Sequence, residues 1–180
     1  MDAGRISEAG REERAESRAL SGPKTYPMSE DYAELMTTFP LLEGFTANGT
    51  KRLLAAGEIT ELAAGDVLLK EGETAEFAVL ILKGTIEVFV EREGKQLALT
   101  EATAGDILGE LALLCGIPRS ASARAKEDST VLKWSDESLH TLLLRDRSLA
   151  QRIFRETLRT LVDKERELVD SLVKAQSATT

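Results

Sequence analysis

The chain has 180 residues, of which 42% are hydrophobic, and it carries a formal net charge of −8. This length predicts one domain with appendages, and the apolar content is sufficient for a buried core. The acidic balance argues against a protein that binds the phosphate backbone of a nucleic acid.

The chain contains one cysteine, Cys115, and one histidine, His140. It therefore offers no internal disulfide, no multi-thiolate metal site and no histidine-based catalytic set, and we assign no catalytic residue, no metal ligand and no enzymatic activity. We expect Cys115 to lie in the core or beside the glycine-rich stretch described below. We expect His140 on the surface of a helix.

The first residues are not followed by an apolar segment, so no signal peptide is predicted. No stretch approaches the roughly 20 apolar residues of a membrane span. A reducing compartment fits a chain with a single cysteine. We therefore expect a cytoplasmic protein without a membrane partner.

Residues 1–28 are charged and alanine-rich, which predicts a flexible tail ahead of one domain over residues 29–180. Within that domain, residues 29–57 show helical patterns. Ser29 is positioned to cap a first short helix, and a second is predicted from Thr46 to Ala56. The first helix contains Tyr32, Leu35 and Met36, and the second is expected to direct Leu53 and Leu54 inward.

Residues 58–135 contain many short apolar segments, separated by glycine-containing turns roughly ten residues apart. This pattern predicts an antiparallel sandwich or barrel. The segment 77–82 is apolar at every position, as expected of a central strand buried on both faces. In the strand predicted at 66–70, strict alternation places Val67 and Leu69 on one face and Leu68 on the other.

The most informative stretch is residues 105–125, which reads G-D-I-L-G-E-L-A-L-L-C-G-I-P-R-S-A-S-A-R-A. Gly109 permits an unusual backbone conformation ahead of a short apolar helix, and Gly116 and Pro118 end that helix. Unpaired amides at the helix start and the forked guanidinium of Arg119 are groups that bind phosphate oxygens. Glu110 suits a ligand that also carries a sugar hydroxyl.

This stretch resembles the phosphate-binding cassette of the cyclic nucleotide-binding domain family. The family includes regulatory subunits of protein kinase A, the bacterial catabolite activator and the tails of nucleotide-gated channels. The residues that match are G-E-L-A-L at 109–113 and P-R-S-A at 118–121, and Leu108 replaces the aromatic residue that usually precedes them. The resemblance extends over roughly residues 40–175, although Thr74-Ala75 replaces a turn in which many members have a second glycine.

The resemblance implies an α+β fold that is mainly β: an antiparallel β-roll or jelly-roll barrel with N-terminal helices, a short cassette helix and two C-terminal helices. It implies that Glu110 binds the ribose 2′-hydroxyl, whereas Arg119, Ser120 and backbone amides bind the cyclic phosphate. The alternative is a buried Glu110–Arg119 ion pair that only braces the loop. The candidate ligand-binding residues are Gly109, Glu110, Leu111, Ala112, Arg119, Ser120, Ala121 and, less directly, Glu165.

Residues 136–176 are predicted to form two C-terminal helices, the first capped by Ser135 or Asp136 and the second beginning near Ser148. The second helix carries a coiled-coil-like stripe at Phe154, Leu158, Leu161, position 165, Leu168 and Leu172, and only Glu165 in it is polar. The stripe fits a helix that closes over the nucleotide, one that pairs in a homodimer through residues 148–176, or one packed along its own barrel. Glu165 is either an acceptor for the nucleotide base or a solvated charge.

The function expected from these features is a cyclic nucleotide sensor that repositions its C-terminal helices for a separate effector protein. Ser120 favours cAMP, while cGMP and cyclic di-GMP remain open. The chain ends soon after the last helix, without the helix-turn-helix domain that transcription factors of this family carry, so no nucleic-acid partner is expected. The alternative is a ligand-free docking or dimerisation scaffold with the same fold.

Overall fold

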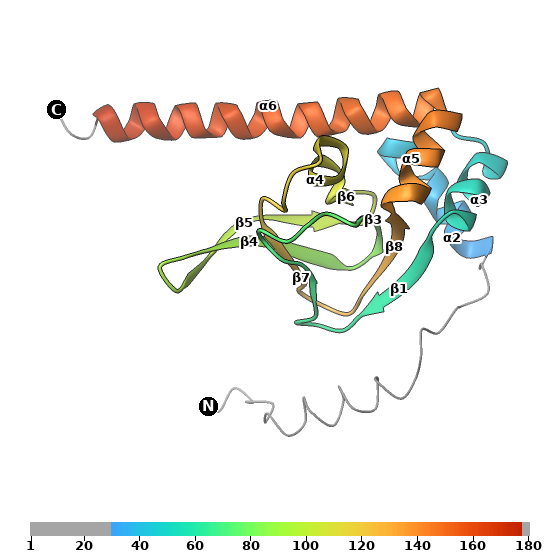
Figure 1. Cartoon of the computed structure of the whole chain (residues 1–180), viewed down its shortest axis with the longest axis horizontal. Coiled ribbons are helices and arrows are strands. Elements are labelled where there is room, and N and C mark those ends of the chain that lie inside the picture. Colours follow the sequence, from blue (N-terminus) through green and yellow to red (C-terminus); the bar gives the residue numbers. More distant parts are fainter. Residues whose placement is uncertain (1–29, 178–180) are drawn as a thin grey trace, which may run out of the picture.

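The computed structural model describes residues 30–177, shown in colour in Figure 1. The tail predicted at residues 1–28 and the capping role predicted for Ser29 lie outside the described residues. The helices are α2 (Glu30–Thr37), the 3-10 turn η1 (Pro40–Leu42), α3 (Ala47–Ala55), α4 (Glu110–Cys115), α5 (Asp136–Arg145) and α6 (Arg147–Ser177). The strands are β1 (Glu58–Leu62), β2 (Val67–Leu69), β3 (Phe77–Lys83), β4 (Thr85–Arg92), β5 (Lys95–Thr103), β6 (Ile107–Leu108), β7 (Ser122–Ala125) and β8 (Ser129–Ser135).

The strands form two antiparallel four-stranded sheets, in the orders β1-β8-β3-β6 and β2-β7-β4-β5. The sheets lie against each other below the long helix α6, and α2, α3 and α5 gather at one end of them (Figure 1). No ladder among the described strands joins the two sheets into a closed barrel. The β-roll expectation is therefore confirmed, with open rather than closed sheets.

Strand β3 explains why one segment is apolar at every position. Val79 and Ile81 face the core between the two sheets, together with residues such as Ile86 and Val131. The alternate residues of the same strand face the second core, between this sheet and the helices: Ala78, Leu80 and Leu82. Because successive side chains point to opposite faces, a strand buried on both sides must be apolar throughout.

The helices at the end of the sheets begin where the sequence predicts. The Thr46 hydroxyl accepts a hydrogen bond from the Gly49 amide and caps α3, and the Ser135 hydroxyl accepts from the Ser138 amide and caps α5. Trp134 of β8 donates from its indole nitrogen to the carbonyl oxygen of Leu53, 2.9 Å away. This buried bond ties α3 to the sheet.

The prediction that Val67 and Leu69 share one face of β2 is wrong. The register between β2 and β7 shifts between these two residues, and Val67 is 51% exposed whereas Leu69 is 8% exposed. Leu68 packs against the same core as Leu69. A bulge breaks the period of two on which the prediction depended.

Helix α6 buries one side and exposes another. Leu149, Ile153 and Thr157 are spaced four residues apart and are buried against the rest of the domain. The stripe predicted from the sequence lies on a different side of the helix, where Phe154 and Leu158 are 47% and 61% exposed. The described part of the stripe is therefore not packed on its own sheets; the side chains of Leu168 and Leu172 are not among the described ones.

Two further predictions concern single residues. His140 is exposed on α5, as expected. Cys115 is exposed at the last residue of α4, so it lies beside the cassette and not in the core. Within residues 30–177 no helix is long and apolar enough to cross a membrane.

Candidate functional site

The segment between β6 and β7 is shaped by two glycines in the left-handed region. Gly109 has φ = 81° and precedes α4, and Gly116 has φ = 63° and follows it. A Cβ atom at Gly109 would lie 2.4 Å from Nη1 of Arg119, so the side chain of Arg119 occupies the space that only a glycine leaves open. The glycine therefore allows a guanidinium to approach the backbone at the start of α4.

Arg119 is 5% exposed and joins three parts of the chain. Its guanidinium donates to the carbonyl oxygens of Gly109 (2.8 Å) and Phe77 (2.5 Å), and it stacks over the Phe77 ring with 5.0 Å to the centroid. Its own amide donates to the Glu73 carbonyl oxygen at 2.9 Å. The side chain is thus fixed between the cassette, the start of β3 and the loop before it.

Burial and nearby carboxylates act on the Arg119 guanidinium in opposite directions. Burial lowers the pKa of this guanidinium below its ordinary value, whereas three nearby carboxylates act to raise it: those of Glu110, Glu73 and Glu76. The lowered pKa means that burial outweighs these attractions, although an arginine stays protonated at neutral pH. A buried cation of this kind gains stability from an anion placed beside it.

Glu110 is the first residue of α4 and is half-buried. Its Oε1 accepts a hydrogen bond from the hydroxyl of Thr157 on α6 at 3.2 Å, and Thr157 is 7% exposed. No ion pair joins Glu110 to Arg119 in the part of the chain that the structure describes. The two residues interact electrostatically but hydrogen-bond to different groups.

A cavity of about 280 Å³ opens beside Arg119. Its apolar lining comes from Leu68, Leu69 and Phe77, and its charged lining includes Lys70, which pairs with Glu73 at 3.7 Å. Pockets for small ligands usually measure about 300–1,000 Å³, so the cavity lies just below that range. Arg119, Glu73 and Glu76 also line the cavity, so its two cationic side chains are matched in number by two carboxylates.

The family is identified by comparison with known proteins. The model of the cyclic nucleotide-binding domain matches residues 59–146. A solved structure of a cyclic nucleotide-binding-like protein from Brucella abortus is 31% identical, with a TM-score of 0.53, and the match covers 63% of this chain and 97% of that one. The chain belongs to the cyclic nucleotide-binding domain family.

The chain is also similar to other proteins of this family. The Thermus thermophilus catabolite activator protein is 25% identical, with a TM-score of 0.66, and the match covers 72% of this chain and 61% of that one. A cAMP-dependent protein kinase regulatory subunit from Emericella nidulans is 31% identical over 112 residues, which is 62% of this chain and 27% of that protein. The chain thus spans about a quarter of that kinase subunit's length.

The structure brings most of the predicted site residues of this family together. Gly109, Glu110 and Arg119 meet at the start of α4, where Ala112 is buried and Leu111 is half-buried. Ser120 is exposed and Ala121 is half-buried immediately after Arg119. Glu165 is exposed on α6, roughly two turns and about 12 Å along the axis beyond Thr157.

Sequence reasoning missed two residues of this cyclic nucleotide-binding domain that contact the cassette. Phe77 was predicted only as the start of a strand, yet its carbonyl oxygen and ring both contact Arg119. Thr157 follows Leu149 and Ile153 at a spacing of four and is the polar residue on that buried side of α6. A polar residue on an otherwise apolar inward face was the available signal for Thr157.

Proposed function

We propose that this protein is a cyclic nucleotide sensor, with cAMP as the favoured ligand, that acts in the cytoplasm through a separate effector protein. The observation that carries the proposal is the buried guanidinium of Arg119, which lies beside a cavity and contacts the backbone at the start of α4. The negative charge of a cyclic phosphate would neutralise the positive charge of this guanidinium. Charge-assisted contacts of this kind are among the stronger hydrogen bonds in proteins.

The remaining cassette residues complement the other parts of such a ligand. The first backbone amides of α4 have no intrahelical acceptor and can donate to phosphate oxygens beside Arg119 and Ser120. Glu110 is the proposed acceptor for the ribose 2′-hydroxyl, since one carboxylate can accept several hydrogen bonds, of which the bond from Thr157 to Oε1 is one. Ser120 favours cAMP over cGMP in this proposal.

The proposed signal is a change in the position of α6. Because Glu110 contacts Thr157, a ligand that binds Glu110 acts on the same carboxylate that holds the helix. A ligand can shift this equilibrium only by its differential affinity for the two positions of α6. The effector would recognise one of those positions.

The exposed stripe of α6 supports a homodimer as part of this proposal. Its described apolar side chains, Phe154, Leu158 and Leu161, are 40–61% exposed. Three valines of the same helix, Val162, Val169 and Val173, are 43–55% exposed and extend the apolar surface. A second copy of the same helix can cover them by coiled-coil packing. Glu165 lies among these side chains and is the proposed acceptor for the nucleotide base. Because it lies about 12 Å along the helix from Thr157, it can reach a nucleotide in the cassette only if α6 shifts or if it belongs to the helix of a second copy.

The test is calorimetric titration of the nucleotide-stripped protein with cAMP, cGMP and cyclic di-GMP. Micromolar or tighter binding of one of them supports the proposal and identifies the base. Arg119→Ala should weaken that binding by roughly 2–4 kcal/mol. Arg124→Ala is the matched control, because Arg124 lies in β7, after the residues that match the family motif at 109–113 and 118–121, and pairs with Glu87 at 2.6 Å.

Two results would contradict the proposal. Unchanged affinity in Arg119→Ala would remove the cassette from the binding site. If none of the three nucleotides gave a heat of binding or raised the melting temperature, the ligand-free docking or dimerisation scaffold would be favoured. In that case Arg119 would only hold the cassette in place through its hydrogen bonds to Phe77 and Gly109.

A further inference from the structure

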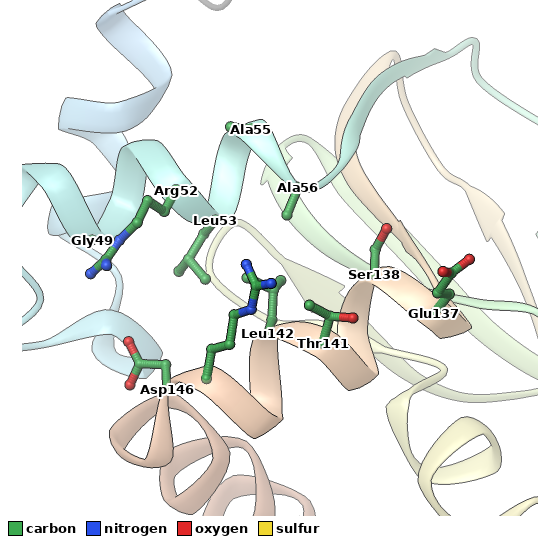
Figure 2. A pocket seen from close by; sticks show the side chains of 11 residues that line it. Gly49, Arg52, Leu53, Ala55, Ala56, Glu137, Ser138, Thr141, Leu142 and Asp146 are labelled. Carbon is green, nitrogen blue, oxygen red and sulfur yellow. The ribbon is translucent and has the colours of Figure 1, made fainter.

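A second and larger concavity lies between α3 and α5. It measures about 650 Å³ and shares no lining residue with the cavity at Arg119. Figure 2 shows the two helices facing each other across it, with Leu53 of α3 directed toward Leu142 of α5. We call this space the α3–α5 groove.

The groove has an apolar floor and two cationic side chains. Leu53 is buried, Leu142 is half-buried, and Ala56 completes the floor. Arg52 and Arg145 line the groove from the last turns of α3 and α5. Neither guanidinium forms an ion pair or a side-chain hydrogen bond with any residue that the structure describes, so their donors are available.

Two acidic residues, Asp146 and Glu137, line opposite ends of the groove. The Asp146 carboxylate accepts a hydrogen bond from the Leu149 amide at 3.0 Å, so it is already engaged at the first turn of α6. Glu137 stands beside Ser138 at the opposite end of the groove from Arg52 (Figure 2). Negative groups near helix starts are stabilised by the helix dipole. Asp146 lies at the same end of the groove as Arg52 (Figure 2), so the two arginines of the lining exceed the carboxylates of that end by one and can bind a further anion.

We propose that the α3–α5 groove is a ligand site separate from the cassette, and that it takes an amphipathic anion. The carboxylate or other acid group of the ligand binds Arg52 and Arg145, and its apolar body lies on Leu53 and Leu142. The volume lies within the usual range of small-ligand pockets, about 300–1,000 Å³. Two guanidiniums on opposite walls give such a ligand a defined orientation.

The groove connects the N-terminal helices to the C-terminal helices. Its walls belong to different parts of the chain, and α5 continues through Asp146 directly into α6. An occupant in contact with both walls therefore restrains α6 relative to the N-terminal helices. The binding itself does not depend on the cassette or on cyclic nucleotide.

The test uses dodecanoate as the probe, titrated calorimetrically into the full chain below its micelle concentration, with amide shifts followed by NMR. Binding should be saturable, and the largest shifts should be those of Gly49, Leu53 and Leu142. The double variant Arg52→Gln/Arg145→Gln should bind at least about tenfold more weakly. The control Arg155→Gln/Arg159→Gln changes the charge equally at exposed positions of α6 and should keep the wild-type affinity.

Three outcomes would overturn this assignment. One is the absence of saturable binding. Another is equal weakening in both double variants, which would show a non-specific effect of charge. The third is a set of amide shifts centred on the exposed stripe of α6. Arg119→Ala should bind dodecanoate normally, so a failure of the cassette proposal and a failure of this one are distinguishable.

Discussion

Thr157 of α6 donates a hydrogen bond to the cassette carboxylate of Glu110, across 3.2 Å. The two residues are far apart in sequence, and this contact joins the C-terminal helix to the first residue of α4. This hydrogen bond restricts the rotamer of the Glu110 carboxylate, which is the acceptor for the ribose hydroxyl in the proposed function. Thr157 is therefore a positioning residue for the proposed site.

Thr157→Val should weaken cyclic nucleotide binding by about three- to tenfold and lower the free energy of unfolding by about 1 kcal/mol, because a nearly isosteric side chain loses the hydroxyl donor. Calorimetry and urea unfolding measure the two effects. Thr160→Val is the matched control on the exposed side of the same helix and should change neither. Tighter binding in Thr157→Val would instead mean that Thr157 competes with the ligand for Glu110.

Gly109→Ala should be much more damaging than Gly116→Ala. Both glycines have positive φ, which costs an alanine roughly 1–2 kcal/mol. Only at Gly109 would the new Cβ collide with Arg119, whereas nothing lies within 4 Å at Gly116. We expect Gly109→Ala to lose in addition about 1–3 kcal/mol from the displaced hydrogen bonds of Arg119. Equal unfolding free energies for the two variants would show that the guanidinium moves aside at no cost.

Trp134→Phe should lower the free energy of unfolding by about 1–3 kcal/mol while cassette affinity stays unchanged. The indole N–H is the donor for the carbonyl oxygen of Leu53, in the last turn of α3, where helix carbonyls lack intrahelical donors. Without that donor, a buried acceptor is left unpaired. Urea unfolding followed by circular dichroism tests this, since the only tryptophan of the chain is lost. A stability equal to that of wild type would contradict the role given to this bond.

The sequence was informative where one local rule determines the structure. The capping chemistry of Ser135 or Asp136 predicted the start of α5, and the unbroken apolar run of β3 predicted burial on both faces. The cassette was predicted because Gly109 and Arg119 occur at a specific spacing. Each of these features lies within one short segment.

The features that sequence missed depend on contacts between distant segments or on local irregularity. The role of Phe77 arises through its backbone carbonyl, which its residue type does not reveal. The bulge in β2 is set by its pairing with β7, so alternation along the strand alone placed Val67 on the wrong face. The partner of Glu110 on α6 was also invisible, because only the folded chain brings Thr157 to the cassette.

Leu158→Glu should convert a dimer to a monomer if α6 pairs with its twin as proposed. Leu158 is 61% exposed in the single chain, so a charge there costs the monomer little, whereas in a helical interface it would be buried without a partner. Leu144→Glu is the matched control, because Leu144 is 73% exposed on α5, outside the stripe, and its substitution should leave the dimer intact. Sedimentation velocity over a range of concentrations separates these results. A wild-type protein that stays monomeric, or a Leu158→Glu variant that stays dimeric, would exclude the stripe as the contact between copies.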